Sequence, residues 1–408
     1  MKKVELLAPA GNLEKLKIAI HYGADAVYIG GKDYGLRAAA GNFSSEEMAE
    51  GLGYAHQHQA KVYVTVNIFA HNTDLIGLAA YFEELERIGV DGVLIADPGV
   101  WQIAREMKTG LNLHISTQAN TTNWASARFW ESQGVKRIVL ARELSLDEIK
   151  EIRSRVRCEL EVFVHGAMCI SYSGRCLLSN YMAGRDANRG ECAQPCRWNY
   201  ALVEEKRPGV YFPISEDERG SYVFNSQDLC LINHLPDLIE AGVDSLKIEG
   251  RMKSVHYVAT IVQAYRKALE TYYQDPGSYV FDPLWYEEIT KVSHRDYTTG
   301  FLFDKPRAAD HNYNTSTYLR YYDFVGLVLD YDPETGWATV EQRNNFKTGD
   351  ELEFTGPNTE LFSQKLVKMT DDEDAGIEVA PHPRQIVHIL VEHPVQIGDM
   401  IRRAKDEG

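Results

Sequence analysis

The first 250 or so residues alternate between short apolar runs and longer amphipathic segments, and this rhythm constrains the fold more than any other feature of the chain. Runs of four or five residues, many of them β-branched, are typical of strands buried on both faces of a parallel sheet. The runs are Val4–Leu7, Ala26–Ile29, Val62–Val66, Gly92–Ala96, Leu113–Ser116, Arg137–Leu140, Leu160–Val164 and Ser245–Ile248. Eight strands that alternate with helices predict an α/β fold of the TIM-like (β/α)8 barrel type, and a doubly wound sheet is the alternative.

The segments between the runs carry helix-start signals. The segment Asn12–Tyr22 begins at a capping asparagine and ends before a glycine. Ser44–His58 opens with two serines and two glutamates, which indicates a capped first turn. Asp74–Ile88 and Ser145–Arg155 follow the same pattern. We therefore expect helices over all four segments.

One interval breaks the rhythm and carries most of the cysteines. About 80 residues separate the seventh run from the eighth, and four of the six cysteines lie there in a C-x6-C pair and a C-x3-C pair: Cys169, Cys176, Cys192 and Cys196. The active sites of (β/α)8 barrels lie at the carboxyl ends of the strands. An insertion directly after the seventh strand would therefore lie on the catalytic face.

The cysteine spacing indicates a metal centre. Four thiolates that a fold brings together can hold an iron–sulfur cluster or a zinc ion. Structural zinc sites favour tight C-x2-C pairs, which are absent here, so the spacing favours iron–sulfur over zinc. The first ten residues do not resemble a signal peptide, so we expect a reducing, cytoplasmic location in which disulfides are disfavoured. Plain buried cysteines are the alternative interpretation.

The composition limits the classes of partner. The chain is 44% hydrophobic and 25% charged, as in ordinary globular proteins. No run approaches the roughly 18 apolar residues of a membrane helix, so no membrane partner is expected. The net charge of −16 argues against wholesale coating of nucleic acid but permits a local basic face.

The pattern predicts a barrel followed by a smaller domain. We assign residues 1–275 to the barrel, with the insertion at about 166–243, and residues 276–317 to a connecting segment. Residues 318–408 are assigned to a small all-β domain, which the alternating short strands predict to be a β-barrel. The strands expected in this last domain are Phe324–Leu329, Trp337–Val340, Glu351–Phe354, Leu366–Met369 and Gln385–Leu390.

Polar residues follow several of the eight apolar runs and would meet at the barrel mouth. Asn67, Asp97 and Gln118 stand at three strand ends, and the two amides are interpreted as functional. Arg142 and Arg251 suit a bidentate clamp on carboxylate or phosphate groups. They suit equally well structural salt bridges to their neighbours Glu143 and Glu249.

A histidine precedes the first clustered cysteine by four residues. His165 suits a general acid or base, and equally a satisfied histidine beneath the cluster. The chain has no His-Glu-x-x-His, no Gly-x-Ser-x-Gly and no phosphate-binding Gly-x-x-x-x-Gly-Lys-Ser/Thr motif. The sequence therefore shows no standard machinery for peptide hydrolysis.

Five segments together resemble a known family. The stretch from Glu161 to Ser179, which contains His165-Gly-Ala-Met-Cys169 and Cys176, is similar to the signature of the collagenase-like peptidases, number thirty-two of the unclassified peptidase families. The resemblance extends over roughly the first 275 residues and to the β tail, through Glu5–Gly11, Ala24–Gly30, Asn188–Trp198 and Ser245–Arg251.

The resemblance implies a chemistry that differs from the family's name. Its better understood branches hydroxylate without molecular oxygen, one on the ubiquinone ring and one at C5 of the wobble uridine of tRNA. The tRNA branch, which this chain resembles more, depends on prephenate. The resemblance also implies a [4Fe–4S] cluster on Cys169, Cys176, Cys192 and Cys196, with Cys230 as a competitor of Cys196 for the fourth position.

Under this resemblance the strand-end residues acquire roles. His165, Glu249, Asn67 and Gln118 become the candidate catalytic residues, and the candidate substrate-binding residues are Arg142, Lys247, Arg251 and Asp97. The cations among them would meet the carboxylates of prephenate. The insertion's arginines form a modest basic island for tRNA phosphates: Arg175, Arg185, Arg189 and Arg197.

Two other functions remain open at this point. One is a peptidase that acts on collagen-like chains. The other is a non-catalytic iron–sulfur subunit that serves a paralogous protein subunit.

Overall fold

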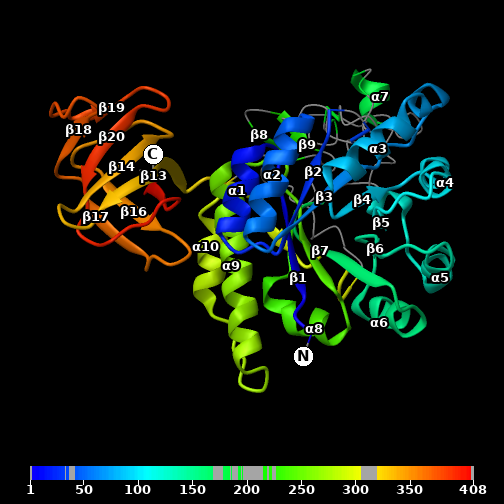
Figure 1. Ribbon diagram of the computed structural model, residues 1–408. Coiled ribbons are helices and arrows are strands. Elements are labelled where there is room, and N and C mark those ends of the chain that lie inside the picture. The colour runs from blue at the N-terminus through cyan, green and yellow to red at the C-terminus, as the bar shows by residue number, and fades with distance from the viewer. Residues whose placement is uncertain are drawn as a thin grey trace, which may run out of the picture.

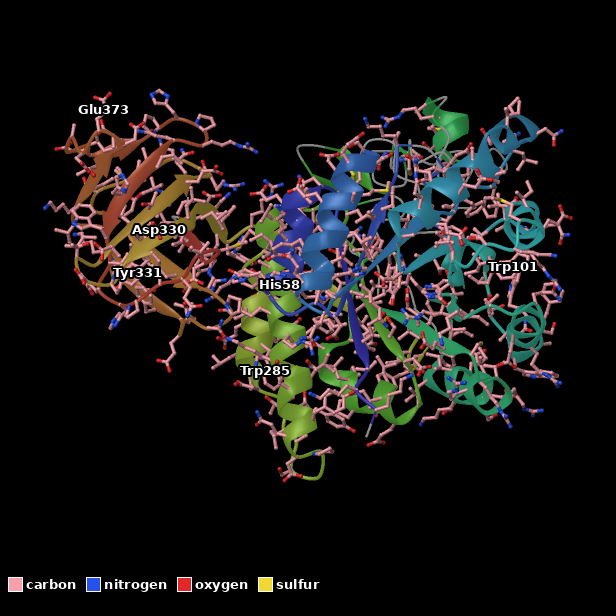
Figure 2. The ribbon with its side chains drawn as sticks, in the orientation of Figure 1. His58, Trp101, Trp285, Asp330, Tyr331 and Glu373 are labelled. Carbon is pink, nitrogen blue, oxygen red and sulfur yellow. The ribbon has the colours of Figure 1, made fainter. Side chains whose placement is uncertain are left out.

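The computed structural model describes residues 2–32, 34–35, 42–168, 178–183, 185, 192–193, 195, 215–217, 220–222, 227–304 and 319–405. Candidate ligands Cys169, Cys176 and Cys196 lie outside these ranges, as do Arg175, Arg189 and Arg197 of the basic island. Figure 1 shows an α/β barrel with a separate β domain beside it. Figure 2 shows Trp285 on the barrel side, and Tyr331 and Glu373 on the β domain.

The barrel is closed by eight parallel strands; seven agree with the predicted bounds to within two residues, and the seventh in chain order extends three residues past its predicted end. Their neighbour order follows the chain, and pairing of the last strand with both the first and the seventh closes the ring. The strands are β1 (Glu5–Pro9), β2 (Ala26–Gly30), β3 (Lys61–Val66), β4 (Gly92–Ile95), β5 (Leu113–Ile115), β6 (Arg137–Val139), β7 (Glu159–Ala167) and β11 (Ser245–Ile248). The predicted (β/α)8 barrel is confirmed.

Helices cover the outside of the barrel, and their starts follow the expected capping chemistry. Asn12 caps α1, and Ser44 and Ser145 form capping boxes at α2 and α6. The helices are α1 (Leu13–His21), α2 (Ser45–Gln57), α3 (Leu78–Ile88), α4 (Pro98–Glu106), α5 (Trp124–Ser132), α6 (Leu146–Arg155), α8 (Leu235–Glu240) and α9 (Val255–Gln274).

One predicted helix is wrong at its start. The segment predicted as one helix from Asp74 is a short 3₁₀ turn, η1 (Asn72–Leu75), followed by the separate helix α3. Gly77 lies between them with φ of 84°, a left-handed conformation that an α-helix cannot contain.

The insertion returns to the barrel as a strand that the sequence did not predict. The described parts of the insertion contain α7 (Leu178–Ala183), β8 (Ser215–Asp217), β9 (Gly220–Tyr222) and β10 (Asp228–Cys230). Strand β10 runs antiparallel to the last residues of β7, with Asp228 opposite Ala167 and Cys230 opposite His165. The carboxylate of Asp228 is held by buried Arg295 at 2.6 Å.

The segment assigned as a connection, 276–317, contributes to the barrel. Its helix α10 (Pro283–Thr290) packs on α9, and its strand β12 (Tyr297–Thr298) pairs with β10. Residues 305–318 lie outside the described ranges. Among the described helices, none is long and apolar enough to cross a membrane.

The C-terminal domain is built on one antiparallel sheet of seven strands in the order β17-β16-β21-β13-β14-β20-β18. These strands are β13 (Tyr322–Asp332), β14 (Trp337–Gln342), β16 (Glu351–Thr355), β17 (Phe362–Lys365), β18 (Met369–Asp371), β20 (Ile386–Leu390) and β21 (Met400–Ala404), and a small ribbon adds β15 (Phe346–Lys347) and β19 (Val379–Ala380). The predicted strand Leu366–Met369 is wrong, because strand pairing stops at Lys365 and resumes at Met369.

The β domain rests on the barrel through hydrogen bonds and ion pairs. The buried hydroxyl of Tyr22, at the end of α1, donates to the carbonyl oxygens of Thr355 at 3.2 Å and Gly398 at 3.0 Å. Buried Arg402 of β21 forms an ion pair with Glu288 of α10 at 2.7 Å. The face formed by α1, α9 and α10 therefore carries the β domain (Figure 1).

Candidate active site at the barrel mouth

Two predicted amides meet at the carboxyl ends of β3 and β5. The Nδ2 of Asn67 donates to Ser116 Oγ at 3.2 Å and to Gln118 Oε1 at 2.9 Å. The Ser116 hydroxyl donates to the same Gln118 oxygen. Gln118 lies in η2 (Thr117–Ala119), a 3₁₀ turn directly after β5. The network fixes both amides in the barrel mouth.

Arg251 and Glu249 follow β11 and contact residues of β2 and β3. Arg251 is only 3% exposed, and its Nη1 donates to Thr65 Oγ1 at 3.1 Å. A Cβ on Gly30 would lie 2.3 Å from that nitrogen, so glycine leaves the space that the guanidinium fills. The Oε2 of Glu249 accepts a hydrogen bond of 3.0 Å from the Tyr28 hydroxyl.

Arg142 bridges the ends of β6 and β7. Its Nη1 donates to the carbonyl oxygen of Ala167 at 2.7 Å, and its guanidinium carbon lies 3.9 Å from the centre of the Phe163 ring. Burial raises the pKa of the neighbouring Glu143 carboxyl, and the positive charge of Arg142 offsets part of this rise. Arg142 is thus positioned by a carbonyl and an aromatic face at the mouth.

His165 has the surroundings of a satisfied, buried histidine, which is one of the two interpretations that the sequence allowed; the other is a general acid or base. It is buried, and the rings of Tyr257, Tyr265 and Tyr297 surround it at centroid distances of 6.0, 5.6 and 5.3 Å. Burial lowers its pKa to about 3, so the ring is neutral at physiological pH. Its side chain supports the wall between β7 and β10.

The side chains of Lys247 and Asp97 make structural contacts within the protein. The ammonium of Lys247 lies 2.7 Å from Glu161 Oε1 inside the barrel, and both side chains are almost fully buried. Glu161 also pairs with Arg137 at 3.0 Å. Asp97 caps helix α4 by accepting backbone hydrogen bonds from Gly99 at 2.7 Å and Val100 at 3.1 Å. Neither prediction of a substrate-binding side chain is supported by these contacts.

Of the four clustered cysteines, Cys192 alone falls within the described residues. Cys192 is exposed, and the backbone N–H of Ala193, the next residue, donates to Ser179 Oγ at 2.9 Å. Ser179 is fully buried in α7 and stands three residues after Cys176 in the sequence. This hydrogen bond joins α7 to the residue that follows Cys192. The described residues alone contain no group of three or more potential metal ligands.

Cys230, the competitor for the fourth position, lies in the barrel wall. Its thiol is buried in β10, and burial raises its pKa to about 11. A cysteine ligand binds as the thiolate, which this apolar setting disfavours. The surroundings of Cys230 fit a structural cysteine.

Sequence reasoning passed over two polar residues of the mouth. Ser116 and Thr121 belong, with Asn120, to the polar run that follows the short strand β5. Asn120 has φ of 52°, a left-handed conformation for which asparagine is suited. The density of polar residues directly after an apolar run was the signal that marks this loop.

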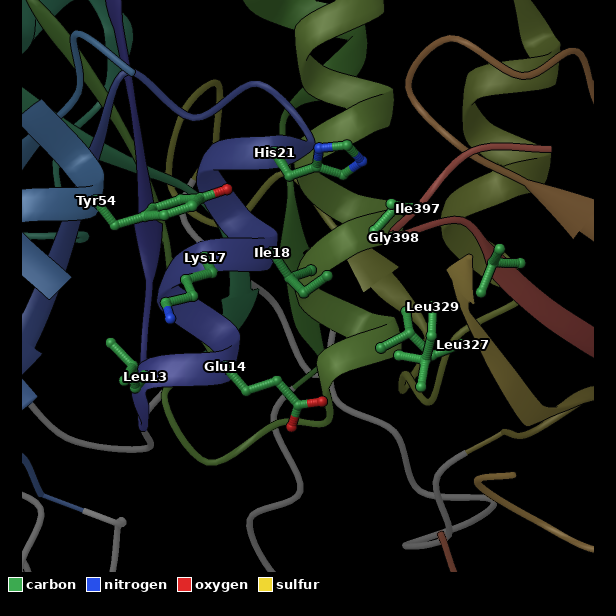
Figure 3. Close-up of a pocket in the computed structure, with 11 residues that line it drawn as sticks. Leu13, Glu14, Lys17, Ile18, His21, Tyr54, Leu327, Leu329, Ile397 and Gly398 are labelled. Atoms are coloured by element: carbon green, nitrogen blue, oxygen red, sulfur yellow. The ribbon is translucent and has the colours of Figure 1, made fainter. Parts of the chain in front are cut away.

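A separate groove lies outside the barrel. It has a volume of about 430 Å³ and is formed by α1, Tyr54 of α2 and the edge of the β domain (Figure 3). Its lining is mainly aliphatic, with Leu327, Leu329 and Ile397 facing Ile18. The polar groups described above do not line it.

A closed (β/α)8 barrel with polar groups at its mouth, a cysteine-bearing insertion after β7 and an antiparallel β domain defines the class of the protein. The chain belongs to Peptidase family U32: the model of that family matches residues 11–312, and the model of the Peptidase family U32 C-terminal domain matches residues 320–402.

Named relatives cover nearly the whole chain. It is 47% identical to tRNA hydroxylation protein P1 of Bacillus subtilis strain 168, over 99% of this chain and 96% of that protein. It is 36% identical to tRNA hydroxylation protein P of Escherichia coli K12, over 97% of this chain and 96% of that protein. It is 37% identical to the 23S rRNA 5-hydroxycytidine C2501 synthase of E. coli K12, over 67% of this chain and 40% of that protein.

Proposed function

We propose that this protein hydroxylates C5 of the wobble uridine of tRNA, without molecular oxygen. The observation that carries the proposal is the 47% identity to a tRNA hydroxylation protein over nearly the full length of both chains. An identity of that level across both domains argues for a shared reaction more strongly than the shared barrel does, because one fold hosts many functions.

The proposal includes a [4Fe–4S] cluster held by Cys169, Cys176, Cys192 and Cys196. The hydrogen bond between Ala193 and Ser179 supports it, because it joins the segments that carry the two cysteine pairs. A bound cluster would supply electron-transfer chemistry at the barrel mouth.

Prephenate is the proposed co-substrate, and the mouth offers a cation for its carboxylates. We assign this role to Arg251, because a guanidinium matches a carboxylate bidentately. Lys247 is left out, since its ammonium neutralises Glu161 inside the barrel. Glu249, oriented by the Tyr28 hydroxyl, is the proposed general base of the site.

The family's name suggests proteolysis, and the contacts of His165 argue against it. A histidine that activates a hydroxyl or thiol nucleophile must be hydrogen-bonded to it. The Nδ1 of His165 instead lies 3.4 Å from the Tyr265 hydroxyl in a buried aromatic environment.

Nucleoside mass spectrometry of tRNA tests the proposal. A strain that lacks this gene and its close paralogues would be complemented with the wild type, with Cys176→Ser or with Cys158→Ser. Cys158 is a matched control, because it is half-buried beside Glu131 and stands directly before β7, whereas the insertion follows the other end of that strand.

We expect the wild type and Cys158→Ser to restore 5-hydroxyuridine-derived nucleosides and iron binding, and Cys176→Ser to restore neither. Unchanged nucleosides in the deletion strain would refute the tRNA reaction. Restoration by the wild type only when a paralogue is also supplied would favour the non-catalytic subunit.

A further inference from the structure

Four buried polar atoms at the barrel mouth have no hydrogen-bond partner among the residues that the structure describes. They are Asn67 Oδ1, Asn120 Oδ1, Thr121 Oγ1 and Arg142 Nε. Asn67 is 7% exposed and Thr121 is 1% exposed. Buried polar atoms are almost always paired, so each of these atoms needs an explanation.

The four atoms belong to one arc of the mouth. Asn67 at the end of β3 is bonded to Ser116 at the end of β5. The turn after β5 contacts the residues after β6, because the backbone N–H of Ala141 donates to the backbone oxygen of Thr121 at 3.2 Å. Arg142 is the next residue along the chain. The arc therefore runs over β3 to β6 and stops at β7, which Arg142 reaches through Ala167.

The arc has a definite chemical preference. Asn67 uses its Nδ2 within the protein, so its remaining Oδ1 is an acceptor that needs a donor from a ligand. The Oδ1 of Asn120 is a second acceptor, the Thr121 hydroxyl can donate or accept, and Arg142 Nε is a donor that needs an oxygen. A ligand that fits must carry an N–H group beside carbonyl oxygens.

A dicarboxylate does not satisfy this arc, because its oxygens would face the two amide oxygens. A uracil ring does, because its N3–H lies between the O2 and O4 carbonyls. Cytosine presents an acceptor at N3 and would leave Asn67 Oδ1 unpaired. Unpaired buried groups are the strongest source of discrimination between similar ligands.

We propose that the arc of Asn67, Asn120, Thr121 and Arg142 is the pocket that reads the N3 edge of the target uracil. The inference rests on the proposed function and deepens it, by assigning the base to a pocket over β3 to β6 that adjoins Arg251, the residue proposed for the carboxylates. An anticodon base is single-stranded and can be unstacked into such a pocket.

Two threonines in the same turn provide a matched test. Thr121→Val removes a hydroxyl that makes no hydrogen bond within the described protein. Thr117→Val removes an equally buried hydroxyl that donates to Leu140 O at 3.2 Å. Thr121→Val is therefore expected to fold as well as the wild type, and Thr117→Val to be the less stable of the two.

The experiment measures binding of the full-length, anaerobically purified protein to anticodon stem-loops that carry uridine, 3-methyluridine or cytidine at the wobble position. We expect the wild type to prefer uridine over both by about 10-fold or more, the scale of one buried hydrogen bond. Asn67→Ala and Thr121→Val should lower this preference, and Thr117→Val should keep it.

Equal binding of the three stem-loops by the wild type would refute the assignment of the arc as the uracil-binding pocket. So would a preference that Thr121→Val leaves unchanged, because the arc would then hold only water. The same variants in the complemented deletion strain separate the two claims: full hydroxylation by Thr121→Val and Asn67→Ala removes the pocket and leaves the proposed reaction standing. Unchanged nucleosides on deletion of the gene remove the reaction itself.

Discussion

The buried charge network inside the barrel gives the sharpest prediction of stability. Glu161 is fully buried and accepts from Lys247 at 2.7 Å and from Arg137 at 3.0 Å. In Glu161→Gln, Arg137 keeps Glu5 and Glu159 as partners. Lys247 loses the carboxylate with which it forms its ion pair in the described structure.

The expected cost follows from this geometry. Removing one partner of a buried ion pair strands the other charge and typically costs about 3–5 kcal/mol. Glu50→Gln is a matched control, because Glu50 pairs with Lys17 at the same 2.7 Å while the two side chains are 57% and 39% exposed. An exposed pair of this kind contributes about 0–1 kcal/mol.

Urea denaturation at neutral pH measures both variants. We expect the free energy of unfolding to fall by at least about 2 kcal/mol more in Glu161→Gln than in Glu50→Gln. The double variant Glu161→Gln with Lys247→Met should regain part of the loss, since no charge is then left alone. Equal losses in the two single variants would refute the assignment of Lys247 to the structural network.

Three further predictions concern other parts of the fold. Burial lowers the pKa of His165 and of His256 to about 3. Below pH 6.5 both histidines are therefore protonated in the unfolded chain and remain neutral in the folded chain until the pH approaches 3. Stability should therefore fall as the pH drops from 6.5 toward 3, by up to about 1.4 kcal/mol per pH unit for each histidine, and His256→Phe should make this slope shallower in urea titrations at several pH values. Gly166→Ala should destabilise the protein by at least about 1–3 kcal/mol, because φ is +109° there and a Cβ would also lie 2.6 Å from the backbone oxygen of Glu249. Gly53→Ala has open space and should not destabilise it, and thermal unfolding compares the two variants. Tyr22→Phe should cost about 0.5–1.5 kcal/mol per lost hydrogen bond to the β domain and increase proteolytic cleavage between the domains, while a wild-type cleavage pattern would show that these bonds contribute little.

The sequence carried enough information for the barrel because its strands are buried on both faces. Such strands appear as uninterrupted apolar runs, and all eight were found at their observed places. Strand β10 was not found, since three residues in the middle of the insertion carry no periodicity. Its pairing with β7 depends on a tertiary contact, which a local pattern does not contain.

The candidate site was only partly predictable for a related reason. The position of Asn67 and Gln118 at strand ends was sufficient to bring them together, because parallel strands end at one edge. Lys247 lies inside the last strand, and its side chain contacts Glu161 within the barrel. Position along a strand gives the face of a residue but not its partner, and the partner decides between a structural and a functional role.

The pairing at the end of β7 has a consequence for the barrel in the absence of any bound group. Strand β10 pairs with the last residues of β7, with Asp228 directly opposite Ala167. The buried ion pair of Asp228 and Arg295 holds β10 at this place and involves no cysteine. Replacement of the clustered cysteines is therefore expected to leave the barrel folded.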